Sequence, residues 1–96
     1  MLYPFMVPQV TVIVPLYNKA ATVERTLSSI QAQTLADFEA IIVNDGSTDK
    51  SLPVAKAFVE RSGDKRFRII DQPNQGPGAA RNRGLIEAQS EVAAFL

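Results

Sequence analysis

Residues 40–49 read Ala-Ile-Ile-Val-Asn-Asp-Gly-Ser-Thr-Asp, an apolar run that changes within one residue to a polar turn. A short, continuously apolar run predicts a strand buried on both faces, which is typical of parallel sheets. The turn places a carboxylate (Asp45), a glycine and two hydroxyls at the point where the strand ends. Open α/β sheets bind their ligands at that position. The stretch therefore predicts a fold class and also the edge of the sheet at which a site should lie.

The same order of strand, polar loop and helix recurs along the chain. Further strands are predicted at residues 10–14, 67–71 and 92–96. Helices are predicted at about 20–33, from an N-cap at Ser51 to Gly63, and at about 77–89, where Leu85, Ile86 and Ala88 would form the apolar side. The strand starts recur about every 25–30 residues, the length of a βα unit with a right-handed crossover. We therefore predict an α/β fold, Rossmann-like, of order βαβαβαβ, with a mostly parallel sheet flanked by helices.

Length and composition limit the possible functions. The chain has 96 residues, ten basic and ten acidic, with no cysteine and no histidine. A chain of this length predicts one small domain over residues 1–96. Zero net charge gives no general field that would attract nucleic acid or anionic lipid, so we expect no nucleic-acid partner. Without cysteine or histidine, a thiol nucleophile, a Cys/His metal site and a Ser-His-Asp triad are all excluded within these residues.

The N-terminal residues 1–8 are apolar but contain two prolines and no basic segment. This pattern does not match a signal peptide, and the run is too short to cross a bilayer. We interpret residues 1–8 as a short arm before the first strand. We expect a soluble, cytoplasmic chain, and the full-length protein could contact a membrane peripherally through parts not present.

The loop that holds Asp45 suits a nucleobase. A carboxylate there can accept the imide N–H of a uracil or thymine ring, a donor that cytosine and adenine do not offer at the same edge. Gly46 allows the positive φ that a tight turn requires. An isolated Asp-Gly-Ser is also typical of an Asx-type turn that only ends a strand, and the motif alone does not separate these interpretations.

The loop after the first strand reads Pro-Leu-Tyr-Asn at residues 15–18. Pro15 fixes φ so that the chain leaves the sheet at a set angle, and Tyr17 offers a flat ring that can lie against a base. Asn18 supplies an amide for the turn or for a ligand. The alternative is a proline-terminated strand with a half-buried tyrosine. Opposite Asp45 on a neighbouring strand end, this loop would complete a base-binding crevice.

The third loop, residues 76–84, reads Gly-Pro-Gly-Ala-Ala-Arg-Asn-Arg-Gly at a predicted helix start. Free N–H groups and the positive helix end favour a diphosphate, and Arg81 could add a bidentate contact. The glycines follow the third strand, whereas the dinucleotide fingerprint follows the first, so a dehydrogenase is disfavoured. The alternative is a glycine-rich connection with two solvated arginines.

Four blocks in this order carry a resemblance: VIVPLYN at residues 12–18, SSIQAQT at 28–34, FEAIIVNDGSTD at 38–49 and NQGPGAARNRG at 74–84. Over about residues 9–96 the chain resembles the N-terminal, nucleotide-sugar-binding half of a family 2 glycosyltransferase of GT-A fold. The ordered set is far more specific than any single block.

The resemblance implies an inverting transfer of a sugar from a nucleotide diphosphate donor, most often a UDP-sugar, to a hydroxyl acceptor on a glycan, a lipid carrier or a protein. It also implies a divalent cation, Mn²⁺ or Mg²⁺, in the full-length enzyme. The nucleotide-sugar-binding residues predicted here are Pro15, Tyr17, Asn18, Asp45 and Arg81. By position in the family, Pro15 and Tyr17 would line the base pocket, Asp45 would bond the uracil and Arg81 would lie near the donor phosphates.

In this family the strand that matches residues 92–96 runs directly into an Asp-x-Asp-like motif that holds the metal, and a later Asp or Glu deprotonates the acceptor. Neither is among these 96 residues, so we assign no catalytic or metal-ligating residue. We expect a truncated chain that binds no metal by itself, has no detectable transferase activity and self-associates through an unpaired strand edge.

Two functions of other classes remain open from the sequence. One is a noncatalytic nucleotide-binding α/β module. The other is a phosphoacceptor domain that uses Asp45, although such domains need an acidic pair after the first strand, where this chain has residues 15–18.

Overall fold

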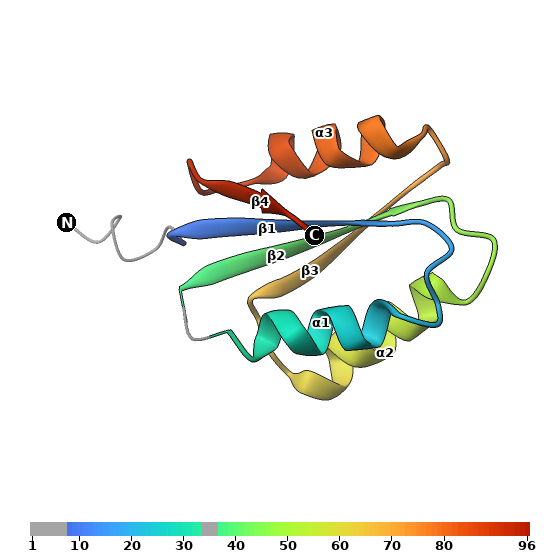
Figure 1. Ribbon diagram of the computed structural model, residues 1–96, viewed down its shortest axis with the longest axis horizontal. Helices are drawn as coiled ribbons and strands as arrows, with labels where there is room; N and C mark the ends of the chain where they lie inside the picture. The colour runs from blue at the N-terminus through green and yellow to red at the C-terminus, as the bar shows by residue number, and fades with distance from the viewer. Residues whose placement is uncertain (1–7, 34–36) are drawn as a thin grey trace.

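A computed structural model describes residues 8–33 and 37–96, which form a sheet with helices on both faces (Figure 1). The elements, in chain order, are β1 (Val10–Leu16), α1 (Val23–Gln31), β2 (Phe38–Asp45), α2 (Ser51–Ser62), β3 (Phe67–Gln72), α3 (Pro77–Glu87) and β4 (Ala93–Phe95). The expected N-terminal arm lies outside the described residues, apart from Pro8. The predicted βαβαβαβ order is confirmed.

The four strands are all parallel, in the order β3-β2-β1-β4. Figure 1 shows α1 and α2 on one face of the sheet and α3 on the other. Because each crossover returns the chain to the same end of the sheet, the loops that follow β1, β2 and β3 meet at one edge. The predicted parallel α/β class is confirmed, and this edge is where the polar loops gather.

The sheet divides the core into two unequal parts. On the α1/α2 face, β2 and both helices pack around a cluster that includes Leu27, Ile42 and Phe58. On the α3 face a smaller cluster forms around Ile41, Val43 and Ala80. All eight residues of β2 are buried, as expected for a central parallel strand.

Pro15 lies inside β1, and the strand continues to Leu16, so the expectation that Pro15 ends the strand is wrong. The N–H of Thr11 donates to the carbonyl of Val92 and the N–H of Leu96 donates to the carbonyl of Ile13, both on the β4 side of β1. Since alternate residues of a strand face opposite neighbours, the missing N–H of Pro15 also falls on the β4 side. The pairing of β1 with β2 is therefore undisturbed.

Helix α2 begins one residue earlier than the sequence predicts. Lys50 occupies the N-cap position and Ser51 is the first helical residue, so the assignment of Ser51 as N-cap is wrong. The carboxylate of Asp49 accepts the N–H of Ser51 at 2.8 Å and thereby serves the helix start from outside. At the other end Gly63, at φ 63°, closes the helix in the left-handed region, as predicted.

Helix α3 packs through small residues rather than through its apolar ones. Its buried positions are Ala80 and Gly84, whereas Leu85 is 46% and Ile86 78% exposed. The two large apolar residues of the predicted helix therefore contribute less to its buried side than Ala80 and Gly84 do. A Cβ atom on Gly84 would overlap the side chain of Ile13, so the helix lies too close to β1 to admit a large side chain between them.

Candidate nucleotide-binding site

The three polar loops enclose a cavity of about 510 Å³ at the carboxyl ends of β1 and β2. Its lining residues are Pro15, Leu16, Tyr17, Lys19, Asp45, Asn74, Gly76, Pro77, Ala80 and Arg81. Four of the predicted residues, Pro15, Tyr17, Asp45 and Arg81, thus line one cavity although they are up to 66 positions apart in sequence (81 − 15 = 66). The fifth, Asn18, does not line it.

Asp45 is the buried acidic group of this cavity, with 2% of its surface exposed. Its Oδ1 accepts hydrogen bonds from Nε2 of Gln72 at 3.0 Å and from the N–H of Gln75 at 2.8 Å. Its Oδ2 accepts the N–H of Gly76 at 3.0 Å. The carboxylate therefore fastens the β3–α3 loop to the end of β2 and does not form the Asx-type turn that the isolated motif also allowed.

These contacts control the charge of Asp45. Burial disfavours the charged form, but the hydrogen bonds from Gln72 and from the N–H groups of Gln75 and Gly76 outweigh it and lower the pKa of Asp45 below its ordinary value. The side chain is an anion at neutral pH and can only accept hydrogen bonds. A partner group in the cavity must therefore bring an N–H or O–H.

The backbone beside Asp45 is equally closely packed against the β3–α3 loop. Nδ2 of Asn74 donates to the carbonyl of Asp45 at 3.0 Å. Gly46 has φ 66°, and a Cβ atom there would lie 2.6 Å from the backbone nitrogen of Asn74. Glycine is thus required at position 46 both for its conformation and for the close approach of the two loops.

Asn18 positions the first loop instead of facing the cavity. Its Oδ1 accepts the N–H of Thr48 at 2.8 Å and that of Asp49 at 3.2 Å, and its own backbone has a positive φ of 51°. Asparagine tolerates this conformation better than most residues. Asn18 therefore joins the loop after β1 to the loop after β2 and holds Tyr17 beside the cavity, with 46% of the tyrosine exposed.

Two cationic side chains line the cavity: Lys19 comes from the loop after β1, and Arg81 comes from α3. Among residues 8–33 and 37–96, neither side chain forms an ion pair. Lys19 is not among the site residues predicted from the sequence, although it directly follows the Pro-Leu-Tyr-Asn motif of residues 15–18. Its backbone N–H donates to Oγ of Ser51 at 2.6 Å, which fixes the start of the side chain.

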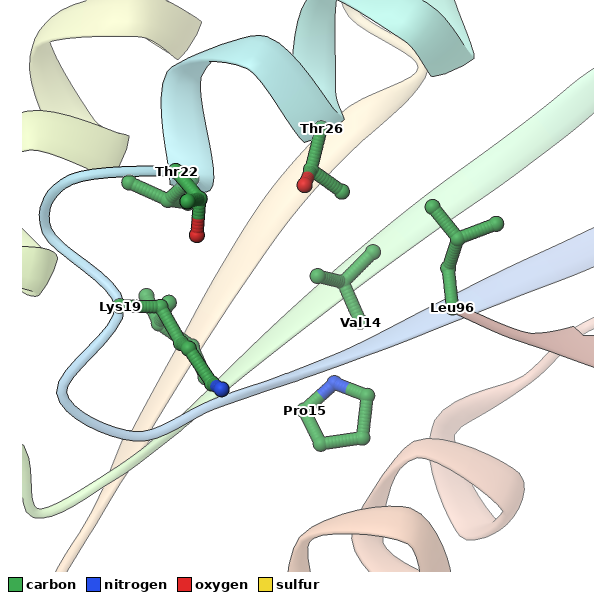
Figure 2. Close-up of a pocket in the computed structure, with 8 residues that line it drawn as sticks. Val14, Pro15, Lys19, Thr22, Thr26 and Leu96 are labelled. Carbon is green, nitrogen blue, oxygen red and sulfur yellow. The ribbon is translucent and has the colours of Figure 1, made fainter.

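A second, smaller cavity of about 290 Å³ lies on the α1 side of β1. Figure 2 shows the side chain of Lys19 extending toward Pro15, with the hydroxyls of Thr22 and Thr26 facing the space above the strand and Leu96 beside Val14. Pro15, Leu16 and Lys19 line both cavities and so form the wall between them.

Residues 8–33 and 37–96 do not form a cluster of acidic side chains that fits a divalent cation. In the described part of the chain no three acidic, histidine or cysteine side chains come together in a way that could hold a metal ion. Asp45 is the acidic residue of the 510 Å³ cavity, and both of its oxygens already accept N–H groups. Cations such as Mg²⁺ and Mn²⁺ need several oxygen ligands, and Asp45 is the one carboxylate among the residues that line this cavity.

The sequence profile of glycosyl transferase family 2 matches residues 11–96, which include every residue that lines the cavity. The chain belongs to this family. The putative glycosyltransferase EpsH of Bacillus subtilis is 42% identical over 89 residues, which cover 93% of this chain and 25% of that protein. The chain thus spans about a quarter of the length of such relatives.

Solved structures agree with this assignment and with the GT-A fold. The mannosyltransferase PcManGT from Pyrobaculum calidifontis, in complex with GDP-Man and Mn²⁺, has a TM-score of 0.84 and 30% identity over 91% of this chain and 26% of its own. S. aureus TarS 1–349, in complex with UDP-GlcNAc, has a TM-score of 0.77 and 29% identity over 92% of this chain and 26% of its own. In the described residues, no helix is both long enough and apolar enough to span a bilayer.

Proposed function

We propose that this chain is the donor-binding part of a glycosyltransferase and that the 510 Å³ cavity holds a nucleotide diphosphate sugar, namely a UDP-sugar. The observation that carries the proposal is the juxtaposition of an ionised, buried Asp45 with a flat tyrosine ring and two cations in one cavity. Each of these features suits a different part of the donor.

The nucleobase would be bound by Asp45 and Tyr17. An acceptor-only carboxylate pairs with the N3–H of uracil and disfavours cytosine, which presents an unprotonated nitrogen at the same edge. The half-exposed ring of Tyr17 offers a face on which the base can stack. Guanine also carries a ring N–H, so GDP is the comparison that tests the preference for uridine.

The diphosphate would be bound by Lys19 and Arg81. The guanidinium of Arg81 can bond two phosphate oxygens at once, and Lys19 adds a point charge from the opposite wall. The N-terminus of α3 lies in the same cavity through Gly76 and Pro77, and its positive end favours the same anion.

In the full-length protein the sugar would pass, with inversion, to a hydroxyl of a glycan, lipid-carrier or protein acceptor, with Mn²⁺ or Mg²⁺ held by residues outside this chain. Because this chain spans about a quarter of its relatives, we expect it to bind the donor without transferring the sugar. A cytoplasmic location, with peripheral membrane contact of the full-length protein, suits a nucleotide-sugar donor.

The proposal is tested by calorimetric titration of the chain with UDP, GDP and CDP, with and without Mn²⁺, repeated on Asp45→Asn. We expect UDP to bind most tightly, with little gain from Mn²⁺ and with a loss of at least about tenfold in Asp45→Asn. Absence of binding to all three nucleotides, in a chain shown to be folded by circular dichroism, would contradict the proposal. UDP binding in a full-length protein that lacks transferase activity would instead favour the noncatalytic module.

A second copy of the chain is a further expected partner. Three large apolar side chains are exposed here: Ile86 on α3, and Phe95 and Leu96 at the β4 edge. Exposed apolar side chains beside an unpaired strand edge favour association between copies. We propose that the isolated chain self-associates at this edge.

A further inference from the structure

The carboxylate of Asp45 has an uneven distribution of hydrogen bonds over its two oxygens. A carboxylate offers two acceptor positions on each oxygen. In the part of the chain that the structure describes, Oδ1 uses both, with Gln72 and with the N–H of Gln75, whereas Oδ2 uses one, with the N–H of Gly76. One acceptor position is therefore left, and it belongs to Oδ2.

Gln72 is the one side chain among these three donors, since the other two are backbone N–H groups. It lies at the end of β3, opposite Asp45 in the parallel register, and only 7% of it is exposed. A buried amide is costly unless its polar atoms are paired, and Asp45 supplies that partner. The pair therefore connects two adjacent strand ends by side chains directly beneath the cavity.

We propose that Gln72 is a positioning residue for nucleobase recognition, because its hydrogen bond fills Oδ1 of Asp45 and leaves Oδ2 as the single oxygen that can accept an N–H from a base. This inference rests on the proposed function. Without the Gln72 amide, Oδ1 has a vacant acceptor position, and only the N–H groups of Gln75 and Gly76 still orient the carboxylate. The base would then meet two alternative acceptors in place of one fixed acceptor.

The surroundings of Asp45 allow the effect to be isolated. The titratable side chains that share its cavity are Tyr17 and Lys19 from the end of β1 and Arg81 from α3. Beneath it, β3 contributes the neutral Gln72. A pH dependence between pH 5 and 8 that appears in Gln72→Glu, but not in Gln72→Met or the wild type, is therefore due to the pair formed by the new carboxyl group and Asp45.

The first variant is Gln72→Met, which keeps the length of the side chain and removes the donor. We expect its affinity for UDP to fall about tenfold, the effect of losing one hydrogen bond to a charged group, while its affinity for CDP stays nearly unchanged. The preference for UDP over CDP thus shrinks by the same factor. Gln9→Met is the matched control, because Gln9 is an exposed amide at the opposite end of β1.

The second variant is Gln72→Glu, which keeps the shape and makes the donor depend on pH. Two carboxylates at this distance share a proton at low pH, so that Glu at position 72 again donates to Asp45, and repel each other when both are charged. We expect its UDP affinity, relative to wild type in the same buffers, to approach wild type near pH 5 and to fall at least about fivefold near pH 8. Because protonation of UDP affects both proteins equally, the ratio of the variant's affinity to the wild-type affinity does not depend on it.

The outcomes separate this inference from the proposed function. If the folded wild-type chain binds no nucleotide, the proposed function fails and this inference fails with it. If the wild type binds UDP and both variants keep its UDP/CDP ratio across pH 5–8, only the role of Gln72 is refuted. Where Gln72→Met does not fold, the pH dependence of Gln72→Glu decides, and failure of both variants to fold at every pH would make Gln72 a structural residue alone.

Discussion

Gly84 of α3 lies directly against Ile13 of β1, so that a Cβ atom at position 84 would overlap Cγ2 of the isoleucine. Ile13 is fully buried in the sheet, so a shift of its side chain would disturb the surrounding core. The absence of a side chain at position 84 therefore sets the distance between α3 and the sheet. It thereby also sets the position of Arg81, which lines the cavity from α3.

We predict that Gly84→Ala destabilises the fold by about 1–3 kcal/mol, because overpacking exceeds the gain in helix propensity. The control is Gly78→Ala in the same helix, where a Cβ atom would meet nothing within 4 Å. That variant should be neutral or more stable by up to about 1 kcal/mol. Urea unfolding followed by circular dichroism measures both, and equal effects at the two positions would contradict the close-packing argument.

Lys19→Ala and Arg81→Ala should weaken UDP binding by about five- to tenfold each and leave binding of uridine unchanged, because both cations are assigned to the diphosphate. The difference in UDP affinity between each variant and the wild type should be smaller at high salt, because salt screens the attraction between the cations and the diphosphate. Calorimetry with UDP and uridine at two ionic strengths tests this. A loss of uridine binding in either variant would place that side chain at the base.

Asn18→Ala should destabilise the chain by about 2–3 kcal/mol, since it removes the acceptor for the N–H groups of Thr48 and Asp49 and places alanine at a positive φ. Asn18→Gly restores the conformational freedom without the acceptor, so its loss should be about half as large. The two variants together separate backbone strain from hydrogen bonding in chemical denaturation. A larger loss for glycine than for alanine would refute the role of the positive φ.

Asp64 should make stability depend on pH. The hydrogen-bonded ion pair with Arg66, N–O 2.6 Å, lowers the pKa of Asp64 to about 2. A group whose pKa is lowered on folding contributes stability above its unfolded value near 3.8 that is lost as pH falls toward 2. We predict that Asp64→Asn costs roughly 1–2 kcal/mol at pH 7, after allowance for solvent screening, and much less at pH 2. A difference from wild type that stays constant over pH 2–7 would rule this out.

Self-association of the isolated chain should depend on the apolar side chains near β4. Light scattering should give a mass that rises with concentration, and Ile86→Lys, which changes the 78% exposed side chain, should reduce that rise. Arg83→Lys on the same helix is the control, because it leaves the apolar surface unchanged. A wild-type chain that stays monomeric at millimolar concentration would refute the proposed partner.

The parallel sheet and the edge that carries the site could be predicted because each apolar strand is followed at once by polar turn residues. The exposure of Leu85 and Ile86 could not be predicted, because the hydrophobic pattern favours large apolar residues inside, whereas α3 packs through Ala80 and Gly84. The side of α3 that faces the sheet is the one with small residues, because Ile13 leaves no room for a side chain at position 84.

The cavity residues could be predicted as a set but not their connections. The sequence predicts Asp45 as a base ligand, yet its three N–H donors come from the end of β3 and the loop after it, about thirty positions later in the chain, and no local pattern links them. The sequence leaves open whether the amide of Asn18 serves the turn or a ligand, because its partners Thr48 and Asp49 lie about thirty positions later. Lys19 could have been predicted from one feature of the sequence, because it is a basic residue directly after a predicted ligand-binding motif.

Pro15 has a consequence that reaches beyond its own position. The N–H of Leu96 donates to the carbonyl of Ile13. The next residue of β1 that faces β4 is Pro15, which has no N–H to donate. A chain running beside β1 at that level can still donate to the carbonyl of Pro15, but its own carbonyl finds no donor there. An ordinary residue at position 15 would offer that donor and so favour a longer ladder between β1 and β4. Proline removes the donor by covalent structure, whatever the state of the ligand.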